Sequence, residues 1–230
     1  MTIIIPSRNA ANLVACVRAI RKAGETARII VIDDGVNWQY VDTLPGSVAD
    51  RANMEIWVGI KPFSFARNVN IGIRAAEQND VILLNDDALL ESPQGFSQLQ
   101  RSAVNNPEYG IIGAVTNVTG QPLQQRLARS QPCFGLRSVG HIAFVAVLIP
   151  RWTLNRIGLL DDRFGSGSYE DRDYCERVTQ AGLKVGVHDA CYVDHGALTS
   201  TFRGAGGPGY NREAEGIYKA KWGIASREAI

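Results

Sequence analysis

The stretch that decides the fold is Arg28-Ile-Ile-Val-Ile-Asp-Asp-Gly35, in which four β-branched residues lead into two adjacent carboxylates and a glycine. A short apolar run bounded by turn formers is typical of a strand buried on both faces of a parallel sheet. The same order recurs at Val81-Ile-Leu-Leu84, which ends in Asn85-Asp86-Asp87. We therefore expect a parallel sheet with acidic residues at the carboxyl ends of two strands.

The segments around these two strands alternate between strand and helix patterns in the same way. We expect strands at 2–6, 28–32, 54–58 and 81–84 and helices at 10–22 and 65–78. Strands that alternate with helices imply βαβ units. The fold class predicted is therefore α/β, with a central, mostly parallel mixed sheet flanked by helices.

The second half of the chain has a less regular pattern. It predicts helices at 93–104, 169–181 and 211–222 and strands at 109–115, 141–149, 184–187 and 191–193. Residues 116–140 show little periodicity and read as a long functional loop. Thr201–Tyr210 holds four glycines, which predicts a mobile lid. We expect one domain over 1–230, with a first half at 1–90 and a second half at 91–230.

Composition excludes several classes of protein. The 230 residues are 45% hydrophobic, which suits one large domain, and 24 basic against 23 acidic residues leave a net charge of +1. Binding to nucleic acid or to a membrane surface through bulk charge is therefore not expected. The longest apolar run, Ile142–Pro150, is half of what a membrane span needs. The first residues show no signal-peptide pattern, and four cysteines without a CxxC pair predict reduced thiols and a cytoplasmic protein.

Two pairs of acids, Asp33-Asp34 and Asp86-Asp87, are expected at the edge of the sheet where ligands bind. Short acids also cap helices and form Asx turns, so either pair could be structural. The glycine-rich phosphate-binding motifs GxGxxG and GxxxxGK[ST] are missing from the sequence. The charge of a bound nucleotide would then be offset by a hard cation on carboxylate oxygens.

A third group of acids begins the helix expected at 169–181. Glu170 and Asp171 lie in its first turn, where Ser168 and Asp171 could equally form a capping box. Asp173 and Arg177 have the spacing of a structural i,i+4 ion pair. His195 follows a short strand, and a lone histidine is more often structural than a ligand. Beside a metal it would complete a mixed oxygen and nitrogen shell.

Taken in order, these motifs resemble those of the family 2 glycosyltransferases, whose fold is the nucleotide-sugar-binding GT-A type. The resemblance runs from residue 2 to about 222. It is carried by Thr2–Asn9, Ile30–Gly35, Ala66–Ile73, Leu83–Asp87, Ile157–Asp161 with Phe164, Tyr169–Arg177, Ala181-Gly182 and His195.

The resemblance implies an inverting transfer of a sugar from a nucleotide diphosphate, most simply a UDP-sugar, to an acceptor hydroxyl. It implies Mn²⁺ or Mg²⁺ as cofactor, a nucleotide-binding half at 1–90 and an acceptor-binding, catalytic half at 91–230. Its nucleotide-binding residues are Pro6, Ser7, Arg8, Asp33, Asp34, Arg67, Asn85 and Asp86, with Asp34 on the base and Asp86 on the ribose. Its metal ligands are Asp87 and His195, and its catalytic residues are Asp171, as the general base, and Glu170.

This assignment agrees with the chemistry of direct displacement, which needs one base on the acceptor and charge stabilisation of the leaving diphosphate. A carboxylate at a helix N-terminus is expected to stay ionised, as a base must. One base without a covalent nucleophile implies inversion.

The sequence departs from the family pattern in three places. Asn85 stands at the first position of the DxD motif and offers no charge, and Arg8 stands where an aromatic residue often stacks on the base. No QxxRW motif follows the Glu170-Asp171 pair, which argues against processive synthesis.

Three alternatives remain open on the sequence. A sugar-phosphate nucleotidyltransferase would need glycines in the first loop, which Pro6–Ala10 lacks. A glycosidase needs no nucleotide pocket, so it would give the pair Asp33-Asp34 no function. A catalytically weak nucleotide- or carbohydrate-binding protein is favoured by Asn85. Donor and acceptor choice is expected to depend on residues 116–140 and 199–212.

Overall fold

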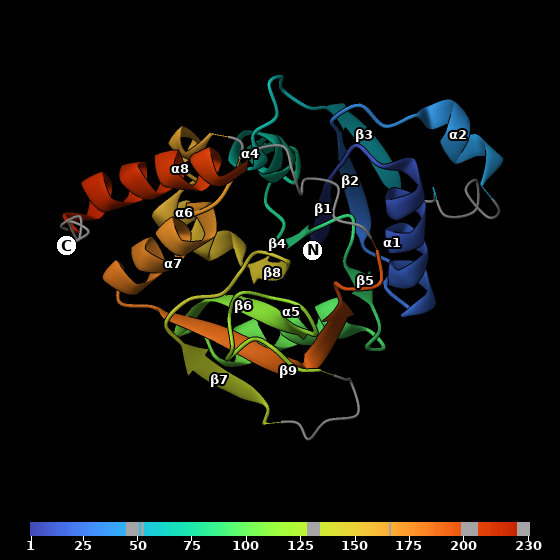
Figure 1. Cartoon of the computed structure of the whole chain (residues 1–230). Helices are drawn as coiled ribbons and strands as arrows, with labels where there is room; N and C mark the ends of the chain where they lie inside the picture. The colour runs from blue at the N-terminus through green and yellow to red at the C-terminus, as the bar shows by residue number, and fades with distance from the viewer. Residues whose placement is uncertain (45–50, 52, 128–133, 166, 199–206, 225–230) are drawn as a thin grey trace.

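The computed structural model describes residues 1–44, 51, 53–127, 134–165, 167–198 and 207–224, with side chains in the last segment described from 212 onward. Helices cover both faces of a central twisted sheet (Figure 1). The strands are β1 (Thr2–Ser7), β2 (Arg28–Asp33), β3 (Met54–Val58), β4 (Val81–Leu84), β5 (Leu89–Leu90), β6 (Tyr109–Thr116), β7 (Leu136–Val139), β8 (Ala146–Ile149) and β9 (Lys184–Asp194). The helices are α1 (Ala10–Lys22), α2 (Trp38–Thr43), α4 (Phe65–Ala75), α5 (Gly95–Asn105), α6 (Arg151–Ile157), the 3₁₀ turn η1 (Asp162–Phe164), α7 (Glu170–Gln180) and α8 (Gly207–Trp222).

Within the described residues, nine strands form one mixed sheet in the order β3-β2-β1-β4-β8-β6-β9-β5, with β7 paired to β9. The strands β3, β2, β1 and β4 are parallel, and β8 is antiparallel to both β4 and β6. Two reversals of direction cancel, so β6 and its parallel partner β9 run in the same direction as β4. The carboxyl ends of β1, β2, β4, β6 and β9 therefore lie along one edge, together with the start of β8.

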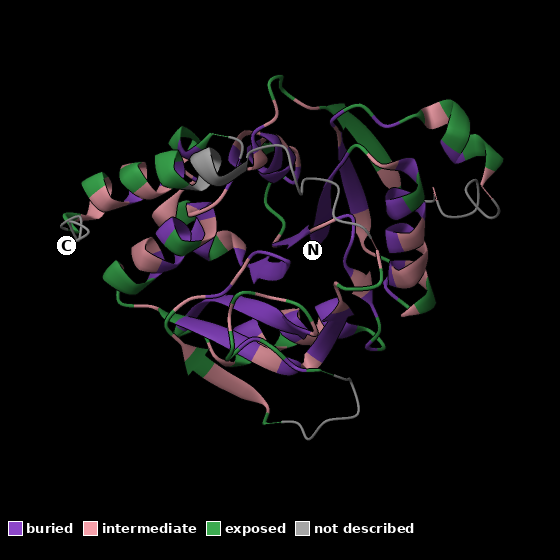
Figure 2. Cartoon of the chain, in the orientation of Figure 1, coloured by how far each residue is buried: buried purple, intermediate pink, exposed green. Residues whose placement is uncertain are grey.

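Alternating side chains of the strands divide the core into two layers. Ile3 and Ile5 pack with α1 and α5 on one face, whereas Ile4 packs with α4 and α7 on the other. Buried residues accordingly follow the strands and the inner faces of the helices (Figure 2). The closest approach is at Gly72 of α4, where an added Cβ would lie 2.5 Å from Ile4 Cγ2. No helix in the described part of the chain is long and apolar enough to cross a membrane.

The strand and helix pattern predicted for the first half is confirmed, with small shifts of the element ends. The predicted helix at 65–78 ends at Ala75, and the short α2 and β5 were not predicted. Both missed elements are brief, so they contain too few residues for a periodic pattern.

The second half differs more from the prediction. The strand predicted at 141–149 begins only at Ala146. Ile142, Phe144 and Val145 gave the preceding stretch the apolar pattern of a strand, but they are buried in a segment that is not a strand. The strand β7 lies inside the predicted loop 116–140, and α6 was also missed. The two short strands predicted at 184–187 and 191–193 form the single strand β9, whose register against β6 shifts after Ala114.

The last predicted helix begins at Gly207 rather than at 211. Residues 201–206 of the predicted lid, and 128–133 of the predicted loop, lie outside the described residues. Three cysteines, Cys16, Cys175 and Cys191, are buried free thiols.

Candidate functional site

Asp34 lies at the carboxyl end of β2 with its side chain fully buried. Its backbone N–H donates to the carbonyl of Ser7 (2.8 Å), which holds the end of β2 against the end of β1. Two cations cover the carboxylate: Lys61 Nζ lies 2.8 Å from Oδ1, and Arg8 Nε lies 3.4 Å from Oδ2. A buried carboxylate with cations on its solvent side is suited to contact a polar ligand at this edge.

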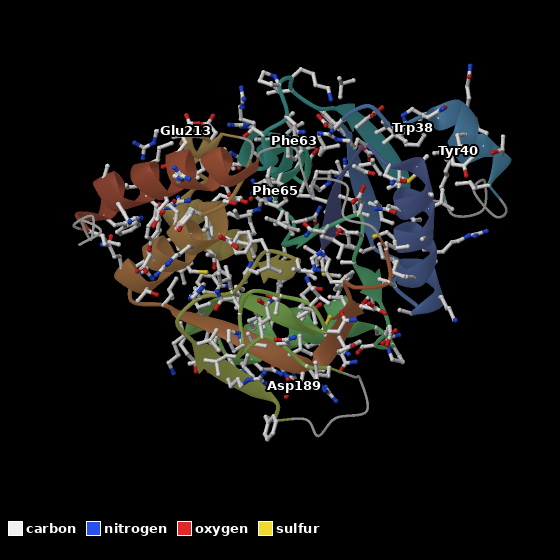
Figure 3. The ribbon with its side chains drawn as sticks, viewed as in Figure 1. Trp38, Tyr40, Phe63, Phe65, Asp189 and Glu213 are labelled. Carbon is white, nitrogen blue, oxygen red and sulfur yellow. The ribbon has the colours of Figure 1, made fainter. Side chains whose placement is uncertain are left out.

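The neighbouring Asp33 has a different environment. Its Oδ1 accepts hydrogen bonds from the backbone N–H groups of Gly35 and Val36, at 2.7 Å each, and its Oδ2 accepts from Trp38 Nε1 at 2.6 Å. Trp38 lies at the start of α2 (Figure 3). Asp33 thus forms the Asx turn that the sequence left open as its structural alternative. It orients the turn that follows Asp34.

The end of β4 is tied to both of its neighbours in the sheet. Asp86 is buried, and its Oδ2 accepts a 2.6 Å hydrogen bond from the hydroxyl of Ser7. The backbone N–H of Asn85 donates to the carbonyl of Val145 (2.9 Å), just before the antiparallel strand β8. These contacts place the predicted ribose-binding acid next to Ser7 and bring the second half of the chain to the Asn85-Asp86-Asp87 motif.

Asp87 meets His195 at this edge, although 108 positions separate them in the sequence. His195 Nε2 lies 3.2 Å from Asp87 Oδ1, and both side chains are largely buried. His195 Nδ1 lies 2.9 Å from the carbonyl oxygen of Val118. Since a carbonyl only accepts hydrogen bonds, Nδ1 carries a proton, and in a neutral ring Nε2 then presents its lone pair to Asp87. Two acceptors that face each other at this distance repel unless a proton or a cation lies between them.

Asn117 fixes His195 from the end of β6. Its Oδ1 accepts the backbone N–H of His195 (2.8 Å), and its Nδ2 donates to Asp194 Oδ1 (2.8 Å). Asn117 was not among the residues predicted from the sequence. It lies directly after a strand, as Asp34 does, and this position is the signal that could have identified it.

The pair Glu170-Asp171 begins α7. Tyr169 takes the N-cap position with a left-handed backbone (φ 69°) and makes no side-chain cap hydrogen bond within the described residues. The capping box expected as the alternative for Ser168 and Asp171 is therefore not formed, because Ser168 also has a positive φ, 78°, and lies before the N-cap. Two successive non-glycine residues with positive φ are uncommon and are found at functional sites more often than elsewhere.

The two carboxyl groups of this pair differ in environment. Glu170 is buried, its Oε2 has no hydrogen-bond partner among the described residues, and burial together with the charge of Asp171 raises its pKa to about 8. Asp171 is half-buried, and its Oδ1 accepts a hydrogen bond from the backbone N–H of Arg172 (2.7 Å). The backbone amides of Arg172 and Phe144 act to lower its pKa. Burial nevertheless raises the pKa of Asp171 above its ordinary value. A helix N-terminus would lower the pKa of a carboxyl group. The pKa of Asp171 is raised instead, because the cost of burying its charge exceeds the stabilisation of that charge by the backbone amides.

A pocket of about 340 Å³ opens beside Asp171. The residues that line it are Gln121, His141, Ser168, Tyr169, Asp171 and Arg172. Its volume lies within the usual range for small-molecule sites. The backbone amide of Phe144 acts on the pKa of Asp171 and so lies near its carboxylate, and the next residue, Val145, accepts the N–H of Asn85. The pocket therefore adjoins the end of β4.

The remaining predicted residues lie around this edge. Pro6 is buried in β1, and Arg8 extends from its end with the guanidinium 5.6 Å from the centre of the Phe63 ring. Arg67 lies in the first turn of α4 and donates from Nη2 to the carbonyl of Pro62 (3.4 Å). Besides Asn117, four further site residues were not predicted individually from the sequence: Lys61, Gln121, His141 and Arg172. Among these four, Lys61 follows a predicted parallel strand, and Gln121 lies in the loop 116–140 expected to affect specificity.

Comparison with known proteins identifies one matching family. The family model described as "Glycosyl transferase family 2" matches residues 2–158, about two thirds of the chain. Among curated proteins, none matches the chain.

Two solved structures resemble the whole fold. A structure of GalNAc-T7 with UDP, GalNAc and Mn²⁺ aligns with a TM-score of 0.67 at 14% identity, covering 84% of this chain and 43% of that one. The mannosyltransferase PcManGT from Pyrobaculum calidifontis, in complex with GDP-Man and Mn²⁺, aligns with a TM-score of 0.64 at 15% identity, covering 88% and 57%. The chain thus spans about half the length of these structures. The likeness confirms the GT-A fold expected from the sequence.

Proposed function

The chain belongs to glycosyl transferase family 2, and we propose that it is an inverting glycosyltransferase that needs a divalent metal ion. In this proposal it moves one sugar from a nucleotide-diphosphate donor, most simply a UDP-sugar, to an acceptor hydroxyl and does not polymerise. The observation that carries the proposal is the Asp87–His195 pair, which lies on the same edge of the sheet as Asp34 and Asp86.

The nucleotide is assigned to the ends of β1, β2 and β4. Asp34 contacts the base, with the guanidinium of Arg8 as a flat surface beside it. Asp86, already held by Ser7, contacts the ribose. Asp33 acts through the turn it forms and not by touching the nucleotide. The two similar structures were solved with a uridine and a guanosine nucleotide respectively, which supports a nucleotide site in this fold.

The donor set of Asp87 and His195 fits Mn²⁺ or Mg²⁺. Asp87 supplies a carboxylate oxygen, and His195 supplies a ring nitrogen whose orientation is fixed by Val118. The described residues contain no group of three or more His, Cys, Asp or Glu side chains for a metal. Asp87 and His195 would hold the ion as protein ligands. When bound, it would offset the negative charge of the leaving diphosphate.

The acceptor is assigned to the pocket beside Asp171. Its hydroxyl oxygen attacks the anomeric carbon of the donor, the bond from that carbon to the diphosphate oxygen breaks, and Asp171 takes the hydroxyl proton. The products are the glycoside and the nucleoside diphosphate. A single displacement inverts the configuration at the anomeric carbon. The raised pKa of Asp171 makes it a stronger base than an ordinary aspartate.

The test is Asp87→Ala, studied by titration calorimetry with UDP in the presence and absence of Mn²⁺. We expect the parent to bind UDP more tightly with Mn²⁺ and the variant to lose that enhancement, because it loses the carboxylate ligand. A panel of nucleotide sugars scored for Mn²⁺-dependent turnover identifies the donor in the same preparation. Binding without turnover of any donor would instead identify a binding protein.

Glu108→Ala is the matched control. Glu108 precedes β6 at the opposite edge of the sheet and pairs with Lys184 on the surface, so its removal should leave UDP binding unchanged. If Asp87→Ala binds UDP with Mn²⁺ as the parent does, the metal site lies elsewhere.

A further inference from the structure

Lys61 places its ammonium group on the carboxylate of Asp34. Nζ lies 2.8 Å from Asp34 Oδ1 and also donates to the backbone carbonyl of Asp34. The Asp34 side chain is fully buried, whereas that of Lys61 is 61% exposed. The ammonium can therefore turn toward a ligand without opening the core, while the carboxylate below it stays in place.

The loop that carries Lys61 is attached to the end of β2 by its backbone. The N–H of Gly59 donates to the carbonyl of Asp33 (2.8 Å), and the N–H of Ile60 donates to Oδ1 of the buried Asn68 (2.9 Å). A Cβ added at Gly59 would lie 2.9 Å from the carbonyl oxygen of Asp33. The packing of this loop thus fixes the backbone of Lys61 next to Asp34. The ion pair does not depend on a chance conformation of a mobile surface side chain.

The other carboxylate oxygen of Asp34 has different neighbours. Oδ2 is buried and accepts no hydrogen bond from the described residues, although Arg8 Nε lies 3.4 Å away as an ion-pair partner. Arg8 in turn lies over the ring of Phe63, which Figure 3 shows between β3 and α4. A buried oxygen that lacks a hydrogen bond is stabilised when an N–H group reaches it. An ammonium group has three N–H donors and keeps one for a ligand while it holds Asp34.

Asp34 Oδ2 is thus a hydrogen-bond acceptor that lies beside a donor, the ammonium group of Lys61. This pair is complementary to a nucleotide base in which a ring N–H lies next to a carbonyl group. With Asp34 on the base as the proposed function assigns it, its Oδ2 would accept the ring N–H, and we infer that Lys61 donates to the carbonyl oxygen next to that N–H. The site then selects uracil or guanine over cytosine or adenine. The inference rests on the proposed function and adds to it the residue that reads the base. Cytosine and adenine present an unprotonated ring nitrogen at this position, which would face the carboxylate as a second acceptor.

The test compares the binding of UDP, GDP, CDP and ADP, each with Mn²⁺, to the parent and to Lys61→Met. We expect the parent to bind UDP or GDP at least about tenfold more tightly than CDP and ADP, since hydrogen-bonding sites reject ligands that leave their polar groups unpaired. Lys61→Met keeps the aliphatic stem and loses the donor. It should weaken the preferred nucleotide about tenfold and change CDP and ADP less than about threefold.

Two further variants separate base reading from general charge. Lys61→Arg keeps a cationic donor and should retain most of the preference. Lys184→Met removes an exposed lysine from the opposite edge of the sheet and should change nothing. Equal weakening of all four nucleotides by Lys61→Met would overturn the inference and leave the proposed function standing, because it would show a contact with the diphosphate. A parent that binds none of the four would overturn both.

Discussion

Glu170 and Asp171 are adjacent in the sequence, yet only one of them reaches the pocket. Asp171 lines the pocket and accepts a backbone hydrogen bond from Arg172, whereas Glu170 is buried with one oxygen unpartnered among the described residues. The pKa of Glu170 is raised to about 8, so at neutral pH it is mostly protonated. A neutral neighbour leaves Asp171 as the carboxylate that is free to take a proton.

We therefore predict that Asp171→Asn reduces the rate of sugar transfer about a hundredfold or more, the usual scale for general base catalysis. Asparagine keeps the oxygen that accepts the N–H of Arg172, so donor affinity and melting temperature should hardly change. The measurement is kcat for transfer, together with donor titration and thermal unfolding.

Glu170→Gln is the control in the same helical turn. Glutamine resembles the protonated side chain, so the loss of transfer should be much smaller than with Asp171→Asn. If Asp171→Asn keeps near-parental transfer, another group is the base, and the role carried over from the family at this motif is wrong.

At the scale of elements, α4 packs so closely on β1 at Gly72 that a side chain at this position would clash with the strand. Gly72 faces Ile4, and the absence of a Cβ lets the helix rest on the strand. The same helix carries Arg67 in its first turn and Asn68, which holds the loop of Lys61. The close packing of α4 therefore supports the side of the site to which we assign the nucleotide.

Gly72→Ala should lower the free energy of unfolding by about 1–3 kcal/mol, because its Cβ would lie 2.5 Å from Ile4 Cγ2 and force an overpacked core to move. Denaturant unfolding measures the change. Gly216→Ala is the matched control in α8, where an added Cβ meets nothing within 4 Å, and it should stabilise the helix by about 0.5–1 kcal/mol. A neutral Gly72→Ala would mean that α4 does not pack on β1 as described.

The helix α8 is joined to α7 through Asp173. This fully buried carboxylate accepts hydrogen bonds from Trp222 Nε1 (3.0 Å) and Arg177 Nε (3.0 Å), and Lys221 Nζ lies 2.6 Å from it. The i,i+4 pair of Asp173 and Arg177 expected from the sequence is confirmed. Asp173 thus attaches the C-terminal helix to the helix that carries Asp171.

At the scale of the whole molecule, the site joins the two halves of the chain. Asp34, Asp86 and Asp87 come from the first half, and His195 and Asp171 come from the second. The antiparallel strand β8 makes this possible, because it starts at the edge where β4 ends. A ligand bound across this edge would stabilise the folded chain as a whole.

We predict that UDP and Mn²⁺ together raise the melting temperature by about 5 °C or more at saturating concentration, since a ligand at a hundred times its Kd contributes about 2.7 kcal/mol. UDP with a chelator should raise it much less, because the diphosphate would then face Asp87 without a neutralising cation. Thermal denaturation monitored by circular dichroism is sufficient. An equal increase with and without the metal would contradict the role given to Asp87 and His195.

The sequence by itself determined the order of the main strands and helices and the placement of acids at strand ends. Local periodicity encodes these features, since the repeats of 2.0 and 3.6 residues are properties of each segment alone. Asp34, Asp86 and Asp87 could therefore be identified without coordinates. Elements with a weak local pattern, such as the short α2 and the strand β7, could not.

Only the tertiary structure decided which of these residues meet. His195 reaches Asp87 because β9 runs in the direction of β4, and Val145 reaches Asn85 because β8 runs against β4 and starts where β4 ends. Lys61 covers Asp34 because its loop is bonded to Asn68 of another element. Strand order, strand direction and loop packing arise from contacts between distant segments, and the free energy of those contacts is not visible in any single stretch of the chain.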